Sequence, residues 1–261
     1  MGPLTAEGIR LKAFSPPYDR FEATAEAVLG RKNPACGKAL VWWLVDGSAQ
    51  LGEFDRILAR PHGVPVIVLL PAAAEIRLTL PLLHRVLDLA PRSVLPAPYL
   101  GTPAYLRQVL ATPPRSLAEA VIRYLRRRGI LRSEIVEQEV RRIFDLASET
   151  TSVSRLARRM YTSRRTLGRH FAAARLPVPS HWLQFARLLH VAVQLQNDSA
   201  AIFRIATRSG YPDGFTMSNQ MKRLIGHRPT EVRECLGWEW IVEAWLRQEA
   251  GRGQIVLERS A

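Results

Sequence analysis

The sequence predicts two domains of different class: an α/β domain with a mostly parallel sheet, and after it an all-α domain. Over residues 1–114, short apolar runs alternate with helix-like segments, an alternation typical of parallel sheets covered by helices. From about residue 150 to residue 248, only segments with helical periodicity follow. The charge divides similarly, since residues 1–114 carry 12 basic and 9 acidic side chains and residues 115–261 carry 25 and 14. A basic second half favours a polyanionic partner, although a bias toward arginine alone would also produce it.

The α/β domain is expected to contain four strands. Two of them, Ala39–Val45 and Pro65–Leu70, are apolar on both faces, as buried parallel strands are. The other strands are expected at Ile9–Phe14 and Ser93–Leu95, and helices are expected near residues 18–30, 50–60, 75–89 and 102–111.

The first domain is expected to end at residue 114, after two consecutive prolines. Ser116 and Glu119 have the spacing of a capping box, in which the two side chains satisfy backbone N–H groups at the start of a helix. This spacing predicts a connecting helix within residues 115–132, and Gly129 is placed to end it.

The second domain contains an internal repeat. Four residues recur by type 50 positions later: Tyr161, Leu167, Phe171 and Pro179 recur as Tyr211, Met217, Met221 and Pro229. The pair Leu156-Ala157 recurs after 49 positions as Ile205-Ala206, because the second copy has one extra residue in its turn. Two copies of one helix–turn–helix unit are therefore predicted.

In each copy, polar residues are placed to cap both helices. The expected caps are Ser152 and Ser163 in the first copy, and Asp198 or Ser199 and Asp213 in the second. The second helix of each copy has an outer face, formed by Arg165, Gly168, Arg169 and Ala172 in the first and by Phe215, Ser218, Asn219 and Lys222 in the second. Two helices around such a turn present the second helix to the major groove of DNA.

Residues 135–234 resemble the C-terminal domain of AraC/XylS-type transcription regulators. The family pattern is matched by Leu156-Ala157, Ser163, Leu167, Arg169 and Phe171 in the first unit, by Arg187-Leu188, Ala192 and Leu195 in the connecting helix, and by Ile205-Ala206, Gly210-Tyr211, Met217, Met221-Lys222, Gly226, Pro229 and Arg233 in the second unit. The resemblance implies a DNA-binding domain, which we assign to residues 133–248 together with an extra C-terminal helix beyond the family pattern. Residues 249–261 are expected to form a tail. The resemblance also implies a sequence-specific transcription regulator with two recognition helices in successive major grooves of double-stranded DNA.

The chain departs from the family pattern mainly in the second unit. Met217 and Met221 replace phenylalanines, which should keep the core but soften it. Asn219 replaces a frequent arginine and Phe215 a small polar residue, whereas Gly168, in the first unit, replaces a longer contact residue. The first unit is therefore expected to be the stronger reader of phosphates and guanine.

The candidate DNA-contacting residues lie on or beside the second helix of each unit. They are Arg158, Ser163, Arg164, Arg165, Thr166, Gly168 and Arg169 in the first unit, and Asp213, Phe215, Thr216, Ser218, Asn219, Lys222 and Arg223 in the second. Arg165 and Arg169 either bond guanine bidentately, contact phosphates or remain solvated. Asn219 either reads adenine or has only a surface role, and Phe215 is expected to pack locally rather than to touch a thymine methyl group.

Asp46 ends the second predicted strand, where receiver domains hold their phosphorylated aspartate, and the strand–helix alternation weakly resembles such a domain. The supporting chemistry is missing, since Phe14-Ser-Pro-Pro17 replaces the acidic pair that binds Mg²⁺, Leu70-Pro71 the hydroxyl residue, and Ala97 the lysine. We therefore expect a degenerate receiver-like domain without a phosphoacceptor. Three alternatives stay open: a phosphorylation-activated response regulator, a regulator that senses a small-molecule effector in its N-terminal domain, and a sequestering protein without base readout.

Other classes of site are not expected. The sequence contains no catalytic motif and no metal-ligand spacing, so we expect no enzyme, no cofactor and no metal. Its two cysteines, Cys36 and Cys235, fall one in each predicted domain, which fits a reducing cytoplasm rather than a disulfide framework. The longest apolar run, Ala39–Val45, is too short to span a membrane.

Two helical segments raise the question of partners. The helices expected within residues 116–147 carry wide apolar faces that are buried either by the two domains or by a homodimer, contacted mainly through the N-terminal half. The Trp-rich segment Gly237–Leu246 predicts one more helix, packed on the DNA-binding domain or open to a partner.

Overall fold

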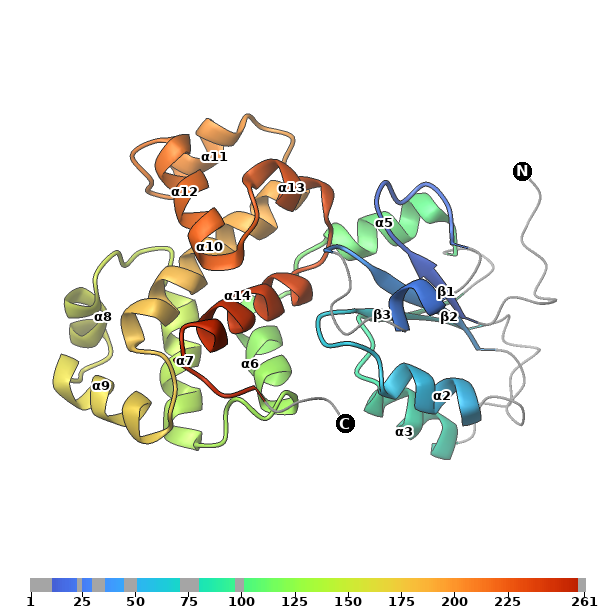
Figure 1. Cartoon of the computed structure of the whole chain (residues 1–261), viewed down its shortest axis with the longest axis horizontal. Helices are drawn as coiled ribbons and strands as arrows, with labels where there is room; N and C mark the ends of the chain where they lie inside the picture. Colours follow the sequence, from blue (N-terminus) through green and yellow to red (C-terminus); the bar gives the residue numbers. More distant parts are fainter. Residues whose placement is uncertain are drawn as a thin grey trace. The chain divides into compact units, whose positions relative to one another are not determined.

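The computed structural model describes residues 11–22, 25–29, 36–44, 51–70, 80–96 and 101–257. The chain forms two compact units (Figure 1). The first unit combines the chain up to Thr112 with the segment Glu234–Trp240, and the second combines Pro113–Arg233 with the chain from Ile241 onward. The expected connecting helix thus groups with the helical unit, and a segment distant in sequence completes the α/β unit.

The first unit contains a four-stranded sheet in the order β1-β2-β3-β4. Strand β1 (Leu11–Phe14) is antiparallel to β2 (Ala39–Trp43), whereas β3 (Val66–Leu70) and β4 (Ser93–Pro96) continue the sheet in parallel. The helices of this unit are α1 (Glu26–Leu29), α2 (Leu51–Leu58), α3 (Leu80–Asp88) and α5 (Pro103–Ala111). The prediction of an α/β unit with a mostly parallel sheet is confirmed.

Both faces of this sheet are covered, which explains its uninterrupted apolar runs. On one face, Leu40, Trp42, Val66 and Val68 pack with side chains of α2 and α3. Helix α5 lies on the other side of the sheet from α2 and α3 (Figure 1). There, Val41, Ile67 and Leu69 pack with Leu106 and Leu110 of this helix. Leu236, from the segment Glu234–Trp240, joins this second cluster. A period-two alternation of buried residues therefore serves two separate cores.

The structure corrects one helix of this unit. A helix was expected near residues 18–30, but α1 covers only Glu26–Leu29. The chain turns after β1, and Phe21 returns to form an isolated antiparallel bridge with Phe14, which leaves the intervening backbone no helical conformation. The two rings also pack together, with centroids 5.3 Å apart.

The receiver-like assignment stays a prediction. Doubly wound domains of that type have the strand order 2-1-3-4-5, whereas the described strands run 1-2-3-4 with an antiparallel first strand. Asp46, Pro71 and Ala97 lie outside the described residues.

The second unit is all-α, as predicted. Its helices are α6 (Leu117–Arg127), α7 (Glu134–Leu146), α8 (Val153–Arg159), α9 (Arg164–Ala173), α10 (Pro179–Asn197), α11 (Ile202–Arg208), α12 (Gly214–Ile225), α13 (Pro229–Glu234) and α14 (Glu239–Gly251). Ser116 caps α6 by accepting from the N–H of Glu119 at 3.2 Å, and Gly129 ends the helix with φ at +69°. No described helix is both long enough and apolar enough to cross a bilayer.

The Trp-rich helix α14 is a core element of this unit. The Trp245 ring stacks on Phe185 of α10 at 4.2 Å between centroids and meets Trp182 edge-on at 4.6 Å. Its buried Glu243 accepts from the hydroxyl of Tyr124 at 2.8 Å and pairs with Arg128 at 3.2 Å, both on or beside α6. The helix ends at Gly251, three residues into the segment expected to be a tail.

The apolar faces of α6 and α7 are buried. On α6 these are Leu117, Val121, Ile122 and Leu125, and on α7 they are Val136, Val140, Ile143 and Phe144. Ile135 alone among the large apolar side chains of these two helices is mostly exposed, at 60 %. The surplus apolar surface on which a homodimer was argued is therefore absent from these helices.

Candidate nucleic-acid interface

The first helix–turn–helix unit is formed by α8 and α9. Helix α8 ends in a left-handed residue, Tyr161 with φ at +54°, and the next N–H, that of Thr162, donates to the carbonyl of Ala157 at 3.0 Å. This is the hydrogen bond of a Schellman turn. Ser163 then caps α9 by accepting from the N–H of Thr166 at 3.0 Å. Leu167 and Phe171 of α9 are fully buried, so the opposite face is presented outward.

The second helix–turn–helix unit repeats this geometry with α11 and α12. Gly210 has φ at +73°, and Tyr211 donates its N–H to the carbonyl of Ala206 at 3.0 Å. Asp213 caps α12 by accepting from the N–H of Thr216 at 2.6 Å, and this hydrogen bond lowers the pKa of Asp213. The buried side chains Met217 and Met221 stand in the positions of Leu167 and Phe171, as the repeat predicted.

The pairing of Tyr161 with Tyr211 was wrong. Through the turn the two copies are offset by 49 residues, so Tyr161 corresponds to the left-handed Gly210. Tyr161 is 94 % exposed, whereas Tyr211 is buried beneath Arg187, whose guanidinium lies 5.2 Å from the ring centroid. The extra residue of the second copy comes after this point, which restores the offset of 50 at Ser163 and Asp213.

The expected cap of α11 was also wrong. Its N-cap is Ala201, without a side-chain hydrogen bond, and not Asp198 or Ser199. Asp198 instead ends α10 and accepts from the N–H of Ala200 at 2.7 Å. Three residues separate Asp198 from Ile202, the first residue of α11, so its carboxylate lies too early in the chain to reach the N–H groups of the first turn.

An arginine from the preceding helix holds each turn, a feature that the sequence repeat did not reveal. Arg142 of α7 donates to the carbonyls of Arg159 and Met160, at 3.1 and 3.3 Å. In the second helix–turn–helix unit, Arg187 of α10 donates to the carbonyls of Ser209 and Gly210, at 3.4 and 3.5 Å. These carbonyls lie at the ends of α8 and α11 and have no partner inside their own helix, so the arginines satisfy them.

The outer face of α9 is positively charged. Residues 153–173 include six arginines and no acidic residue. Arg164, Arg165 and Arg169 are exposed, and within the described part of the chain none of them forms an ion pair. Gly168 lies between them, and a Cβ at this position would have no atom within 4 Å. This surface can therefore approach a polyanion closely.

The outer face of α12 is less charged and more apolar. Phe215 is 76 % exposed, so the expectation that it packs locally was wrong. Phe203 of α11, which the sequence analysis did not single out, is 62 % exposed and lies against Gly214, the residue before Phe215. Thr216 and Asn219 are exposed beside Phe215, and Ser218 is half-buried.

The basic residues at the end of α12 have partners within the fold. Lys222 donates to the carbonyl of Gly226 at 2.8 Å, and Arg223 donates to the amide oxygen of Gln184 at 3.0 Å. Arg233 of α13 is also structural, since it donates to the carbonyls of Leu195 and Ala200 and so ties α10 to the start of α11. The charge available for a ligand is therefore concentrated on the first helix–turn–helix unit.

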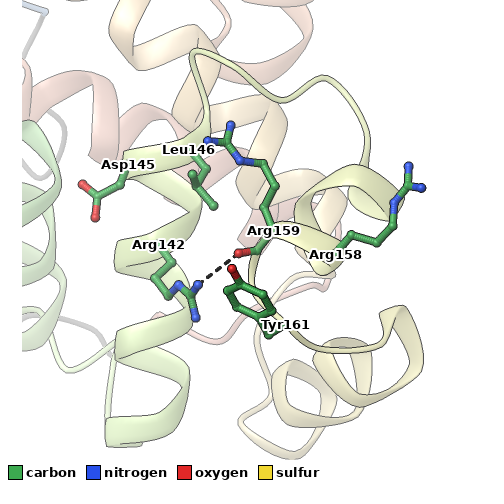
Figure 2. Close-up of a pocket in the computed structure, with 6 residues that line it drawn as sticks. All are labelled: Arg142, Asp145, Leu146, Arg158, Arg159 and Tyr161. Atoms are coloured by element: carbon green, nitrogen blue, oxygen red, sulfur yellow. Dashed lines mark hydrogen bonds between the residues drawn. The ribbon is translucent and has the colours of Figure 1, made fainter.

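Arg158 lies at the edge of a surface cavity of about 540 Å³ beside the first turn. Figure 2 shows its lining: Arg142, Asp145, Leu146, Arg158, Arg159 and Tyr161. Arg158 points away from the other side chains, whereas Arg142 bonds to the backbone of Arg159. Arg159 pairs with Glu149 at 2.5 Å, which leaves Arg158 as the more available charge of the two.

The comparisons with known proteins agree with this geometry. A family model described as a helix-turn-helix domain matches residues 156–234. The match extends from within α8 to the end of α13 and so includes the second helix of each unit. A search of the curated proteins found no match.

Proposed function

We propose that this chain, a DNA-binding transcription regulator with an AraC-type helix-turn-helix domain at residues 156–234, places α9 and α12 in successive major grooves of double-stranded DNA. The observation that carries the proposal is the outer face of α9, where exposed arginines flank a glycine with open space around it. Arg165 and Arg169, one helical turn apart, bond guanine edges or phosphates. Gly168 lets the helix backbone come close to the groove.

The two recognition helices have different parts in this proposal. Helix α9 supplies most of the electrostatic attraction, together with Arg158 and Arg164 near its N-terminal end. Helix α12 contributes contacts without formal charge, through Phe215, Thr216, Ser218 and Asn219. Asn219 has the two-ended hydrogen bonding that recognises adenine, and the exposed ring of Phe215 suits a thymine methyl group.

Binding to DNA at different salt concentrations tests the electrostatic part. A pool of random duplexes first selects the preferred site, and its affinity is then measured between about 50 and 200 mM salt. Each neutralised phosphate adds about 0.9 to the slope of log K against log salt, so a steep dependence is expected. A flat dependence would contradict DNA binding by this arginine-rich face.

Single substitutions separate base contacts from phosphate contacts. Arg165→Ala or Arg169→Ala should cost about 1–3 kcal/mol on the selected site and relax the preference at one base pair. Arg158→Ala should weaken selected and random duplexes equally. Arg123→Ala, which removes an exposed charge from α6, is the matched control and should change neither. Identical losses for Arg158, Arg165 and Arg169 would exclude base readout by α9.

A homodimer contacted through the α/β unit completes the proposal. Helix α3 exposes Leu83 and Leu87, one turn apart, and Leu58 at the end of α2 is also exposed. These apolar side chains replace the helices of residues 116–147 as the proposed contact surface. A two-fold dimer would present four recognition helices to paired half-sites.

A further inference from the structure

The two cysteines of the chain meet in the first unit. Cys36 comes shortly before β2, and Cys235 lies in Glu234–Trp240, which we call the strap. The strap connects α13 to α14 and includes the last residue of α13 and the first two residues of α14. The two residues were expected in different domains, and the structure corrects this, because the strap packs with the sheet. Both residues are thiols.

The backbone next to Cys36 touches Cys235 directly. Gly37 has φ at +74°, and a Cβ added to it would lie 2.8 Å from the Cα and 2.9 Å from the Cβ of Cys235. Since consecutive Cα atoms are about 3.8 Å apart, the Cα atoms of the two cysteines lie within about 8 Å. Disulfides usually span about 4.4–6.8 Å between Cα atoms, so this upper bound exceeds the usual range by only about 1 Å.

One buried hydroxyl holds the two cysteine segments together. Tyr18 is 3 % exposed; its O–H donates to the carbonyl of Gly37 at 2.5 Å, and its oxygen accepts from the N–H of Leu236 at 2.8 Å. Each of these peptide groups is next to a cysteine. Burial raises the pKa of Tyr18, with smaller contributions from the nearby thiols, so the hydroxyl keeps the proton that it donates.

We propose that Cys36 and Cys235 form a reversible disulfide that fastens the strap to the sheet in response to a hydroperoxide or a small disulfide. Cys36 is half-buried and Cys235 is buried, so the oxidant reacts first with Cys36. With a hydroperoxide, the Cys36 thiolate attacks the terminal oxygen, the O–O bond breaks, and a sulfenic acid forms. The hydroxide or alkoxide that leaves takes up the proton that the Cys36 thiol lost and becomes water or an alcohol. The Cys235 sulfur then attacks the Cys36 sulfur, the S–O bond breaks, and the hydroxide that leaves takes the Cys235 proton as water.

With a small disulfide as oxidant, the electrons balance through a mixed disulfide. The Cys36 thiolate displaces one thiolate of the reagent, and Cys235 displaces the second, so that two protein thiols are oxidised and one small disulfide is reduced. A dithiol reverses both steps. Disulfides in reducing compartments are typically transient and redox-sensing, which is the role proposed here.

The disulfide would close a loop that contains the whole helix-turn-helix domain. Cys235 follows the last residue of α13 and precedes the core helix α14 by four positions. Oxidation therefore fixes the backbone at the exit of the second helix–turn–helix unit. Slower amide exchange is expected over the strap in the oxidised chain, with recovery on reduction.

Thiol counting on the full chain tests the proposal without DNA, so its outcome is independent of the proposed function. The protein is equilibrated with mixtures of reduced and oxidised glutathione, quenched in acid, denatured and alkylated. We expect two alkylated thiols in the reduced chain and none in the oxidised chain, whose monomer is two hydrogens lighter. Cys36→Ser and Cys235→Ser should each retain one thiol and form no internal disulfide.

The equilibrium constant of this exchange with glutathione also measures how far the folded chain favours the disulfide between Cys36 and Cys235. The native chain should form the disulfide at least tenfold more readily than the chain unfolded in guanidinium. Tyr18→Phe, which removes the bridging hydroxyl, should lower this preference severalfold, whereas Tyr105→Phe in the same core cluster should not. Two thiols that survive oxidised glutathione, or disulfides only between chains or with glutathione, would overturn the proposal. An unchanged equilibrium in Tyr18→Phe would overturn the role of the hydroxyl.

Discussion

At the scale of single residues, the exposed ring of Phe215 is unusual for a helix surface. Its exposure, 76 %, means that truncation removes little packing, so Phe215→Ala should change the free energy of unfolding by less than about 0.5 kcal/mol. If the ring touches a thymine methyl group, replacing that thymine by uracil should weaken binding about fourfold, since one buried methyl contributes roughly 0.8 kcal/mol.

Titrations of the selected duplex with thymine or uracil at each position measure this contact. The wild-type chain should respond at one position, and Phe215→Ala should bind both duplexes equally. Phe203→Ala is the matched control, because Phe203 is also exposed but lies on α11. A response to uracil that persists in Phe215→Ala would assign the methyl contact to another residue.

The two equivalent caps, Ser163 and Asp213, differ in charge and so predict different pH behaviour. The folded state lowers the pKa of Asp213, so its stabilisation is complete above the unfolded pKa, near 3.9, and is lost as the pH falls through the lower folded value. Asp213→Ala should therefore destabilise the chain at pH 7 and progressively less in acid. Ser163→Ala should cost about 1 kcal/mol at either pH. Urea unfolding at pH 7 and near pH 3 compares them, and a pH-independent loss for Asp213→Ala would contradict the assignment.

At the scale of elements, α9 carries a glycine where its own packing does not require one. Gly168 is inside the helix, and an added Cβ would meet no atom within 4 Å. Gly168→Ala should raise the free energy of unfolding by about 0.5–1 kcal/mol, because alanine loses less backbone entropy in a helix. Gly214→Ala is the control, since Gly214 is the first residue of α12 and its Cβ would approach the Phe203 backbone at 3.4 Å. Chemical denaturation of both variants measures the change in the free energy of unfolding. A destabilised Gly168→Ala variant would contradict the claim that the space around Gly168 is open.

Helix α14 is a second element whose role follows from its buried charges. Glu243 and Arg128 have side chains only 2 % and 9 % exposed, so removing one partner leaves a buried charge uncompensated. Glu243→Ala should cost about 3–5 kcal/mol, whereas the double variant Arg128→Met, Glu243→Leu should recover most of that loss. Arg247→Ala, exposed on the same helix, should change stability by less than about 0.5 kcal/mol. Urea unfolding that shows no recovery in the double variant would place the cost in packing rather than in the unpaired charge.

At the scale of the whole molecule, what the sequence could predict depended on the range of the interactions involved. The second helix of each repeat was predictable, because Leu167 and Met217 recur in a local periodicity and Ser163 and Asp213 cap within three residues. The short α1 was not, because its predicted range is interrupted by a pairing of Phe21 with Phe14. The strap was assigned to the wrong domain for the same reason, since Leu236 is apolar in either setting and only the fold selects the α/β core.

The oligomeric state is also a property of the whole molecule. The expected contact surface of a homodimer is now on α3 and no longer on α6 and α7. With the apolar faces of α6 and α7 buried, Leu83 and Leu87 are among the exposed apolar side chains that the structure describes in the α/β unit, and they are the proposed dimer contact. Sedimentation equilibrium of the full chain at micromolar concentration should give a dimer, and Leu83→Glu with Leu87→Glu should give a monomer, because charge at a two-fold contact is doubled and desolvated. Ile135→Glu, at an apolar position on α7 that is at least as exposed as either leucine, should leave the dimer intact. A full chain that stays monomeric both with and without DNA would exclude the paired half-sites that a dimer implies.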